Sequence, residues 1–371
     1  MRVGLDLLYL VPGETGGRET YARELVPALL AHEPELELVA FVNRDAGVEL
    51  AAELGDGVRA VVVPVSARSR PQWALGELAL VSLAARRARV ELLHSMANFA
   101  PAWGGCPRVV TIHDLQYQAV PELLSRPTRM ATHALVSLAA RGADRIIAVS
   151  AAGGDEIVAG LGVERERVDV IPNGVRLPTS SPSTEGVRER HQLEGRQVAL
   201  AVATNLPHKN LPRLIDALAL MAPGQRPLLV IAGHGTDDGA LMARATAAGV
   251  GDGVRLLGGL STEELDALYA LADCLVLPTL YEGFGLPVLE AMARSVPVVC
   301  SDIPVLREVA GDAASYFDPR QPEQIVAKIG EVLGNAQVAA WLREQGRVQA
   351  AKFSWAAAAE GTLAGYRRAL G

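Results

Sequence analysis

The sequence Pro278-Thr-Leu-Tyr-Glu-Gly-Phe-Gly-Leu-Pro-Val-Leu-Glu-Ala-Met-Ala293 places two glutamates around a Gly-Phe-Gly turn. The apolar run Cys274–Pro278 that leads into it is typical of a buried parallel strand. From Leu286 to Arg294 apolar residues recur at helical spacing, and Pro287 suits the first turn of a helix, where its missing N–H costs nothing. The predicted order is strand, glycine-containing loop, helix. In an open α/β sheet, ligands bind at the carboxyl ends of such strands.

The helix start in this stretch predicts an anion site. Free backbone N–H groups there suit a phosphate, and Gly283 and Gly285 let the backbone approach it closely. Because a helix rises ~1.5 Å per residue, Glu282 in the loop and Glu290 about a turn into the helix would flank that phosphate. Carboxylates repel a bare anion but bind the hydroxyls on either side of a diphosphate. The predicted ligand is therefore a nucleotide-diphosphate sugar.

The segment Glu282-Gly-Phe-Gly-Leu-Pro-Val-Leu-Glu290 resembles the E-x7-E signature of retaining glycosyltransferases, family 4 in particular. The resemblance implies that Glu282 contacts the hydroxyls of the donor sugar and that Glu290 contacts the ribose. It also implies that backbone amides near the turn hold the diphosphate. The donor-binding residues of this stretch are then Gly283, Phe284, Gly285, Leu286 and Glu290.

Length and composition set the class of protein. A chain of 371 residues predicts two domains, and 50% hydrophobic residues with 4% aromatic residues are typical of an Ala/Leu/Val-rich α/β protein. The net charge of −7 argues against a nucleic-acid partner. The three cysteines lie far apart, and no D-x-D pair or His/Cys cluster follows a strand, so we predict no metal and no cofactor.

Location is predicted from hydropathy. No apolar stretch is long enough and free enough of charge to span a bilayer. The first residues are predicted to form a strand and not a signal peptide, because Asp6 interrupts the apolar run. We therefore expect a cytoplasmic protein, with peripheral attachment to the inner membrane face left open.

A basic stretch is the reason for leaving membrane contact open. Residues 68–89 include Arg68 and Arg70 and end in Arg86-Arg87-Ala88-Arg89, at the end of a helix predicted over 72–90. Arginines in a last turn are favoured by the helix dipole. The alternative is a basic surface for an anionic membrane or for an acceptor phosphate.

The first strand, predicted over Arg2–Leu10, is followed by a glycine-rich loop and a helix over Arg18–Leu30. The loop lacks the G-x-G-x-x-G motif, so it is only weak evidence for a dinucleotide-binding site. By the resemblance, Gly16 and Gly17 match a Gly-Gly loop that faces the donor diphosphate or the acceptor. A turn that needs positive φ is an equally good interpretation.

His113 and Asp114 follow the strand predicted over Arg108–Ile112, at a ligand position. A lone histidine is more often structural, and Asp114 could simply cap a turn. The run Ile-His-Asp-Leu is similar to one in bacterial mannosyl- and glucosyltransferases of the family, in which the histidine lies near the donor sugar. The resemblance places both residues in the site, with a catalytic role for His113.

Lys209 lies between a strand over Gln197–Ala203 and the helix that follows, which suits a cation facing a diphosphate. It matches the family lysine that binds the donor phosphates. Many relatives have an arginine six residues earlier, where this chain has Ala203. The missing positive charge would then come from His208 or from an arginine elsewhere, such as Arg18. The alternative for Lys209 is an exposed lysine at a helix start, where the dipole disfavours it.

Strand and helix alternate in both halves, which predicts two doubly wound parallel sheets. The resemblance implies the GT-B fold, an α/β architecture of two Rossmann-like domains facing a cleft. The predicted domains are 1–178 on the acceptor side and 179–352 for the nucleotide sugar. A C-terminal helix, 353–371, would return to the first domain and be anchored by Trp355.

The predicted function is retaining, metal-independent transfer of a hexose from a nucleotide-diphosphate sugar, with GDP-mannose the best match among donors. The acceptor is a glycan, a lipid-linked sugar or a small natural product. Lys209 would stabilise the leaving diphosphate and Glu282 would orient the sugar. Two alternatives remain: a nucleotide-sugar 2-epimerase on the same fold, and a non-catalytic module that binds sugar nucleotides.

Overall fold

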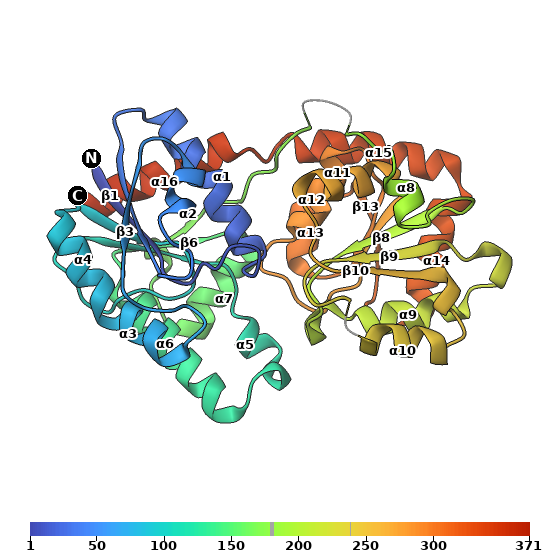
Figure 1. Cartoon of the computed structure of the whole chain (residues 1–371), viewed down its shortest axis with the longest axis horizontal. Helices are drawn as coiled ribbons and strands as arrows, with labels where there is room; N and C mark the ends of the chain where they lie inside the picture. The colour runs from blue at the N-terminus through green and yellow to red at the C-terminus, as the bar shows by residue number, and fades with distance from the viewer. Residues whose placement is uncertain (179–181, 238) are drawn as a thin grey trace. The chain divides into compact units, whose positions relative to one another are not determined.

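The structure, a computed structural model, describes residues 1–178, 182–237 and 239–371 (Figure 1). The chain divides into two compact units. Unit 1 comprises Met1–Gly174 and Ser354–Gly371, and unit 2 comprises Val175–Phe353. Each unit is built on one parallel β-sheet, as the alternation of strands and helices predicted.

The sheet of unit 1 has seven strands in the order β3-β2-β1-β4-β5-β6-β7. The strands are β1 Arg2–Leu7, β2 Glu37–Val42, β3 Val58–Val62, β4 Leu92–Ser95, β5 Arg108–Ile112, β6 Arg145–Ala148 and β7 Val168–Val170. The order reverses between β1 and β4, which are paired in parallel. A ligand position is expected at their carboxyl ends. β1 is shorter than predicted because the amide of Leu8 bonds to the Asp6 carboxylate and leaves the strand ladder.

Helices cover both faces of this sheet. They are α1 Gly17–His32, α2 Glu49–Leu54, α3 Arg70–Leu75, the π-helical η1 Gly76–Leu80, α4 Val81–Ala88, α5 Gln116–Ala119, η2 Pro121–Leu123, α6 Arg126–Gly142, α7 Ala151–Leu161, η3 Arg165–Arg167 and α16 Trp355–Leu370. The helix predicted over 72–90 is therefore one helical run, α3-η1-α4, with a π-helical turn in the middle. α1, α2 and α16 pack on one face of the sheet, and α4, α6 and α7 pack on the other.

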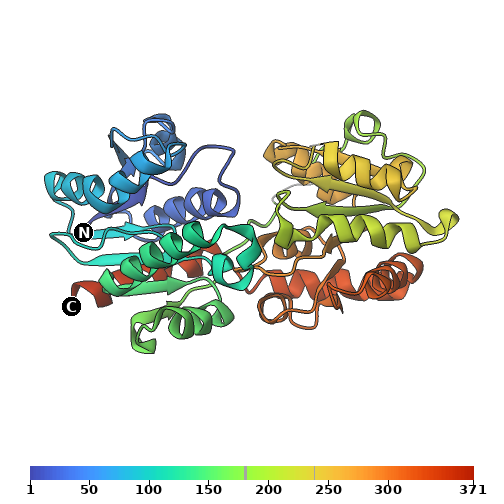
Figure 2. The same ribbon diagram turned by 90° about the horizontal axis from the view of Figure 1, so that it is seen from below.

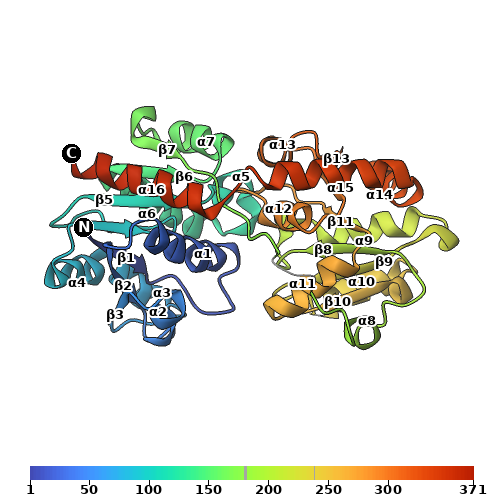
Figure 3. The ribbon, with the colours of Figure 1, turned by 90° about the horizontal axis from the view of Figure 1, so that it is seen from above.

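The C-terminal helix belongs to unit 1, as predicted, and lies beside α1 (Figure 3). Trp355 is buried in the core of this unit, with its ring edge-on to Tyr21 at 6.1 Å between centroids. A buried chain of hydrogen bonds also ties α16 to the sheet. The Tyr366 hydroxyl lies 2.7 Å from His94 Nδ1, and His94 Nε2 lies 2.8 Å from Thr111 Oγ1. Burial lowers the pKa of His94 to about 3, so its ring stays neutral within this network.

The sheet of unit 2 has six strands in the order β10-β9-β8-β11-β12-β13. They are β8 Val198–Val202, β9 Leu228–Ala232, β10 Val254–Leu257, β11 Cys274–Leu277, β12 Val298–Ser301 and β13 Ala314–Phe317. The helical elements are α8 Val187–Arg190, η4 Pro207–Lys209, α9 Leu211–Leu220, η5 Pro223–Gln225, α10 Gly239–Ala247, η6 Gly251–Gly253, α11 Thr262–Leu271, α12 Leu286–Ala293, α13 Pro304–Ala310, α14 Pro322–Gly334 and α15 Ala336–Ala350. The order reverses between β8 and β11, which places a ligand position between the loops that follow these two strands.

Candidate functional site

Two loops meet at the carboxyl ends of β8 and β11, strands that are direct neighbours in the sheet. The loop of residues 203–210 follows β8, and the loop of residues 278–285 follows β11. The amide of Leu280 donates to the His208 carbonyl at 2.7 Å, and the Thr279 hydroxyl donates to the same carbonyl at 3.1 Å. The two loops are therefore held as one unit.

Lys209 and Glu282 form the centre of this site. The ammonium Nζ lies 2.7 Å from Glu282 Oε1, although the residues are 73 positions apart in the sequence. The Lys209 side chain is 17% exposed and that of Glu282 is 9% exposed. An ammonium has three N–H donors, so one held by Glu282 leaves two to bind an anion. The sequence predicted both residues for the donor site but did not predict their direct contact.

Asn210 fixes the position of Lys209, and sequence reasoning missed it. Its backbone is left-handed, with φ of 58°, at the residue that precedes α9. Asparagine tolerates this conformation better than most residues. Its side-chain amide donates to the carbonyls of Pro278 and Pro319 at 2.9 and 2.8 Å. The only signal in the sequence was an asparagine directly before a Leu-Pro helix start.

The amino end of α12 lies in the same loop cluster. Gly285 precedes the helix with φ of 102°, and a Cβ built on it would lie 2.5 Å from Leu306 Cδ2. Glycine is required there for both reasons. No side chain caps this helix start. Pro287 has no N–H, and the Val288 amide donates to the Gly285 carbonyl at 3.0 Å, so the amides that could meet an anion are those of Gly285 and Leu286. Gly283 lies in the same turn. Phe284 is buried with its ring edge-on to Phe353, so a donor would meet its backbone.

Glu290 is oriented by a residue that sequence reasoning did not identify. Its Oε2 accepts a hydrogen bond of 2.8 Å from the hydroxyl of Tyr269, a fully buried residue of α11. Burial and the neighbouring carboxylate raise the pKa of Tyr269 well above its usual value, so the hydroxyl remains a donor. The Arg294 guanidinium lies 5.0 Å from the Tyr269 ring centroid and donates to the Glu290 carbonyl. Asp266 in turn binds Arg294.

His208, predicted to bind the donor, is buried, and its carbonyl is the acceptor that joins the two loops. The structure therefore gives its backbone a structural role. A role for its ring in donor binding stays a prediction.

His113 lies in unit 1, after β5, in a buried setting. Its Nε2 is 2.9 Å from the Met96 carbonyl, and its ring is edge-on to Tyr21 at 4.9 Å. Burial lowers the pKa of His113 to about 4, so the ring is neutral at pH 7. Because a carbonyl can only accept, Nε2 carries the proton and Nδ1 is the acceptor. A neutral His113 can accept a hydrogen bond from a sugar hydroxyl.

The other predicted residues of unit 1 lie in turns. Asp114 accepts a hydrogen bond from the amide of Gln116 at 3.1 Å, which is the turn-capping role that its sequence position also allowed. Gly16 precedes α1 with φ of 61° and ψ of −136°, a positive-φ conformation that favours glycine, and Gly17 is the first residue of that helix. Arg18 is close enough to His113 to lower the pKa of that residue further.

Unit 1 also contains a buried carboxyl pair that the sequence did not reveal. Asp6, at the end of β1, and Glu77, in the π-helical turn, are almost completely buried and hydrogen-bonded to each other. Burial, and then the charge of Asp6, raise the pKa of Glu77 well above its usual value, so Glu77 binds a proton. Among the described residues, Glu77 Oε2 and Trp73 Nε1 have no hydrogen-bond partner. Both residues line a small cavity beside Phe99.

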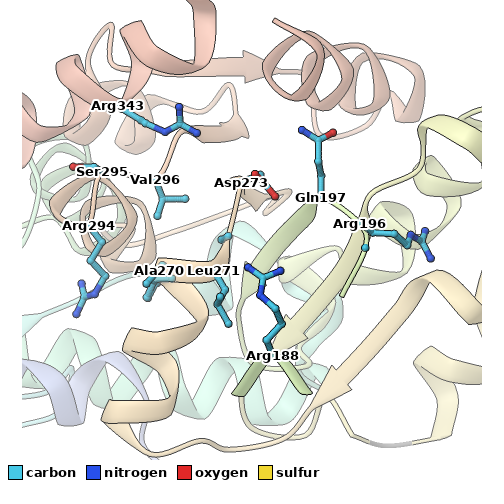
Figure 4. A pocket seen from close by; sticks show the side chains of 13 residues that line it. Arg188, Arg196, Gln197, Ala270, Leu271, Asp273, Arg294, Ser295, Val296 and Arg343 are labelled. Carbon is cyan, nitrogen blue, oxygen red and sulfur yellow. The ribbon is translucent and has the colours of Figure 1, made fainter. Parts of the chain in front are cut away.

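A larger hollow of about 620 Å³ lies at the amino ends of β8 and β11, opposite to the ends where the candidate site lies (Figure 4). Its arginines are Arg188, Arg196, Arg294 and Arg343. Figure 4 shows that the side chains of Arg196 and Arg294 point away from one another. Arg294 binds Asp266, and Arg196 donates to two backbone carbonyls. α11 and α12 end at this hollow, and the helix dipole favours arginines there. The hollow is distinct from the site of Lys209 and Glu282.

Comparison with solved structures identifies the class of fold. Sucrose-phosphate synthase from Thermosynechococcus elongatus is 20% identical, with a TM-score of 0.81 over 99% of this chain and 98% of that one. The HepE protein of Anabaena, solved with UDP and glucose, is 21% identical, with a TM-score of 0.79 over 99% of both chains. The chain has the GT-B fold of glycosyltransferases, built from two Rossmann-like units.

Sequence comparison identifies the family. Residues 15–177 match the family described as Glycosyltransferase Family 4, and residues 183–349 match Glycosyl transferases group 1. O-antigen chain mannosyltransferase B of Escherichia coli is 31% identical over 268 residues, which is 70% of this chain and 70% of that protein. The MMP alpha-(1->4)-mannosyltransferase of Mycolicibacterium hassiacum is 32% identical over 62% of this chain and 56% of its own length. The chain belongs to the family 4 glycosyltransferases.

Proposed function

We propose that the protein transfers a hexose, with mannose the best candidate, from a nucleotide-diphosphate sugar with retention of configuration and without a metal ion. One observation carries this proposal. The Lys209–Glu282 pair, 2.7 Å apart, lies beside the open start of α12 at the point where the strand order of the sheet reverses. A cation, a carboxylate and the backbone amides of Gly285 and Leu286 together suit a sugar joined to a diphosphate.

Each group has a role in this mechanism. The bond from the anomeric carbon to the β-phosphate oxygen breaks, and its electron pair goes to the diphosphate. Lys209 and the backbone amides of Gly285 and Leu286 stabilise the charge that develops there. Glu282 accepts hydrogen bonds from the sugar hydroxyls, and its contact with Lys209 holds the ammonium in place. The acceptor oxygen attacks from the face that the diphosphate leaves, and a phosphate oxygen takes its proton, so configuration is retained.

Other groups would bind the rest of the donor. Glu290, oriented by Tyr269, accepts hydrogen bonds from the ribose hydroxyls. His113 would accept a hydrogen bond from the transferred sugar, with Gly16, Gly17 and Asp114 near the donor. This role for the residues of unit 1 rests on the family resemblance.

The choice of mannose is supported by the two mannosyltransferase relatives and by the Ile-His-Asp-Leu and Pro-His-Lys-Asn segments, which look most like those of GDP-mannose users. The acceptor is a glycan, a lipid-linked sugar or a small molecule. The proposal includes a cytoplasmic location with contact to the inner membrane face through residues 68–89. No helix among the described residues is both long and apolar enough to cross a bilayer.

The test is a transfer assay with GDP-mannose, UDP-glucose, dTDP-glucose and ADP-glucose, followed by NMR of the anomeric proton of the product. Lys209→Ala should reduce kcat at least 100-fold, of the order seen when one stabilising donor is lost. Lys328→Ala is the control, since Lys328 forms an exposed pair with Glu331 on α14. Inverted product, loss of activity with EDTA, or full activity of Lys209→Ala would each contradict part of the proposal.

A further inference from the structure

The hollow at the amino ends of β8 and β11 has the size of a small-molecule site. Its volume of about 620 Å³ lies within the range of roughly 300–1,000 Å³ that is typical of ligand pockets. All of its lining residues belong to unit 2. Figure 2 and Figure 3 both show α8, drawn in green, and α15, drawn in orange to red, on opposite sides of unit 2. Both helices contribute a lining residue, so the hollow extends from one side of the unit to the other.

The lining of this hollow is positive, although the net charge of the chain is −7. Among the described residues that line it, four are arginines and the only acid is Asp273. One oxygen of that carboxylate, Oδ2, accepts a hydrogen bond from the Val198 amide at 2.8 Å. An excess of one charge in a hollow raises the local concentration of ions of the opposite sign. The hollow therefore favours an anion.

Two of the four arginines have partners within the protein. Arg294 binds Asp266, and it directly follows α12, where the helix dipole favours a cation. Arg196 donates to the carbonyls of Arg226 and Pro227 at 3.2 and 3.1 Å. The fold of unit 2 is a sufficient explanation for these two residues.

The other two arginines, Arg188 of α8 and Arg343 of α15, lack an acidic partner. Within the described part of the chain, neither forms an ion pair within 4.0 Å. Arg188 donates to the Leu193 carbonyl at 3.3 Å, which uses one of its five N–H groups. Arg343 lies in the middle of α15, so no helix end explains its charge. Figure 4 shows Arg343 at the top of the hollow and Arg188 at the bottom.

An exposed arginine by itself would mean little. Arg190 on α8 and Arg347 on α15 are also exposed, but each of them forms an ion pair with a glutamate. Arg188 and Arg343 differ from these neighbours because they line a hollow and have no carboxylate beside them. The planar fork of a guanidinium matches the geometry of a phosphate, so two such groups on opposite walls suit a ligand with a phosphate at each end.

The wall of the hollow also contains the residues that hold Glu290. Tyr269 lines the hollow, and its hydroxyl donates to Glu290 Oε2 at 2.8 Å. Arg294 lines it as well, lies 5.0 Å from the Tyr269 ring centroid and donates to the Glu290 carbonyl at 3.0 Å. These two side chains therefore form a direct physical link between the hollow and the candidate donor site.

We propose that this hollow binds a small polyphosphate anion through Arg188 and Arg343, and that its occupancy strengthens nucleotide binding at Glu290. A bound anion restrains the wall that contains Tyr269 and Arg294, so Glu290 loses less freedom when the nucleotide binds. The effect on the nucleotide rests on the proposed function, in which Glu290 binds the ribose. The anion site itself does not depend on that function.

The experiment is calorimetric titration of the full chain with inorganic tripolyphosphate, and with citrate as a polyanion that lacks phosphate. Arg188→Ser/Arg343→Ser should weaken tripolyphosphate binding at least about tenfold, because hydrogen bonds to a charged group are lost. The matched control is Arg190→Ser/Arg347→Ser, which removes the same charge from the same two helices at positions that do not line the hollow. The control should change the affinity little.

Lys209→Ala separates the two anion sites, because tripolyphosphate also resembles the diphosphate of a donor. Binding that survives in Lys209→Ala and is lost in Arg188→Ser/Arg343→Ser supports the hollow. The reverse pattern overturns the proposal, as does equal loss in the control pair or no binding to the wild type at low salt. Citrate binding as tight as that of tripolyphosphate would overturn the assignment to phosphate.

The link to Glu290 is measured with the nucleoside diphosphate that the donor screen identifies, titrated with and without saturating tripolyphosphate. Competition at the donor site would weaken the nucleotide equally in the wild type and in Arg188→Ser/Arg343→Ser, so the difference between them reports on the hollow. Relative to that variant, tripolyphosphate should strengthen nucleotide binding to the wild type about fivefold or more, and Tyr269→Phe should abolish this gain. Tripolyphosphate binding in the hollow without any gain contradicts the effect on Glu290.

Failure of the proposed function has a different signature. If Glu290→Ala leaves nucleotide affinity unchanged, Glu290 does not bind the ribose. The titration of tripolyphosphate into Arg188→Ser/Arg343→Ser and its control still decides whether the hollow is an anion site, because that measurement involves no nucleotide.

Discussion

Tyr269→Phe tests how the carboxylate of Glu290 is held. The substitution removes the hydroxyl that donates to Glu290 Oε2 at 2.8 Å, and it leaves the ring that packs in the core and lies beneath Arg294. A hydrogen bond to a charged group contributes about 1.5–3 kcal/mol. If about half of that free energy serves to orient Glu290 for binding, its loss weakens nucleotide affinity about 4- to 13-fold.

The assay is calorimetric binding of the nucleoside diphosphate that the donor screen identifies, and of its analogue without ribose hydroxyls. Tyr269→Phe should weaken binding of the parent nucleotide and leave the analogue unaffected, because Glu290 interacts with the hydroxyls. Tyr316→Phe is the control, since its hydroxyl donates to the Gly311 carbonyl elsewhere in unit 2.

Two results would refute this reasoning. If Glu290→Ala weakens binding and Tyr269→Phe does not, Tyr269 does not position Glu290. If both variants weaken the parent nucleotide and the analogue equally, Glu290 does not bind the ribose.

Three further predictions concern stability. The pKa of Glu77 is raised in the folded protein, so its bound proton stabilises the fold at low pH. This stabilisation is fully present below the ordinary glutamate pKa of about 4.3, and it is lost as the pH rises through the raised pKa. Glu77→Gln should flatten this dependence in urea unfolding, and an unchanged pH profile would contradict a protonated Glu77. Gly285→Ala should cost about 1–3 kcal/mol, because φ is 102° and the new Cβ would meet Leu306. Gly162→Ala, with φ of 63° and open space around its Cβ, should cost less, and equal losses would contradict the clash. Tyr366→Phe should lower the free energy of unfolding by about 1 kcal/mol without changing the urea m-value, because only its bond to His94 is removed. A change in m would indicate wider loss of structure.

Local patterns in the sequence were enough to predict the elements of the site. An apolar strand, a Gly-Phe-Gly turn and Pro287 at a helix start each constrain only their near neighbours, so the strand-loop-helix unit at residues 274–293 follows from the sequence alone. The same holds for Lys209, whose place between a strand end and a helix start is also local. Buried Cys274 and Cys300 in β11 and β12 were predicted for the same reason.

Pairing between distant residues was decided by the tertiary structure. Lys209 meets Glu282 because β8 and β11 are neighbours, and the order of strands in a sheet is set by packing over the whole unit. Tyr269 reaches Glu290 from another helix, and Asp6 meets Glu77 because a π-helical turn directs Glu77 inward. Each contact joins segments whose separation in sequence carries no signal of proximity. The sequence by itself therefore predicted Lys209, Glu282 and Glu290 for the candidate site, but not Asn210 or Tyr269. Only the packed sheets decided which of these groups touch, because contact depends on how distant strands and helices share one core.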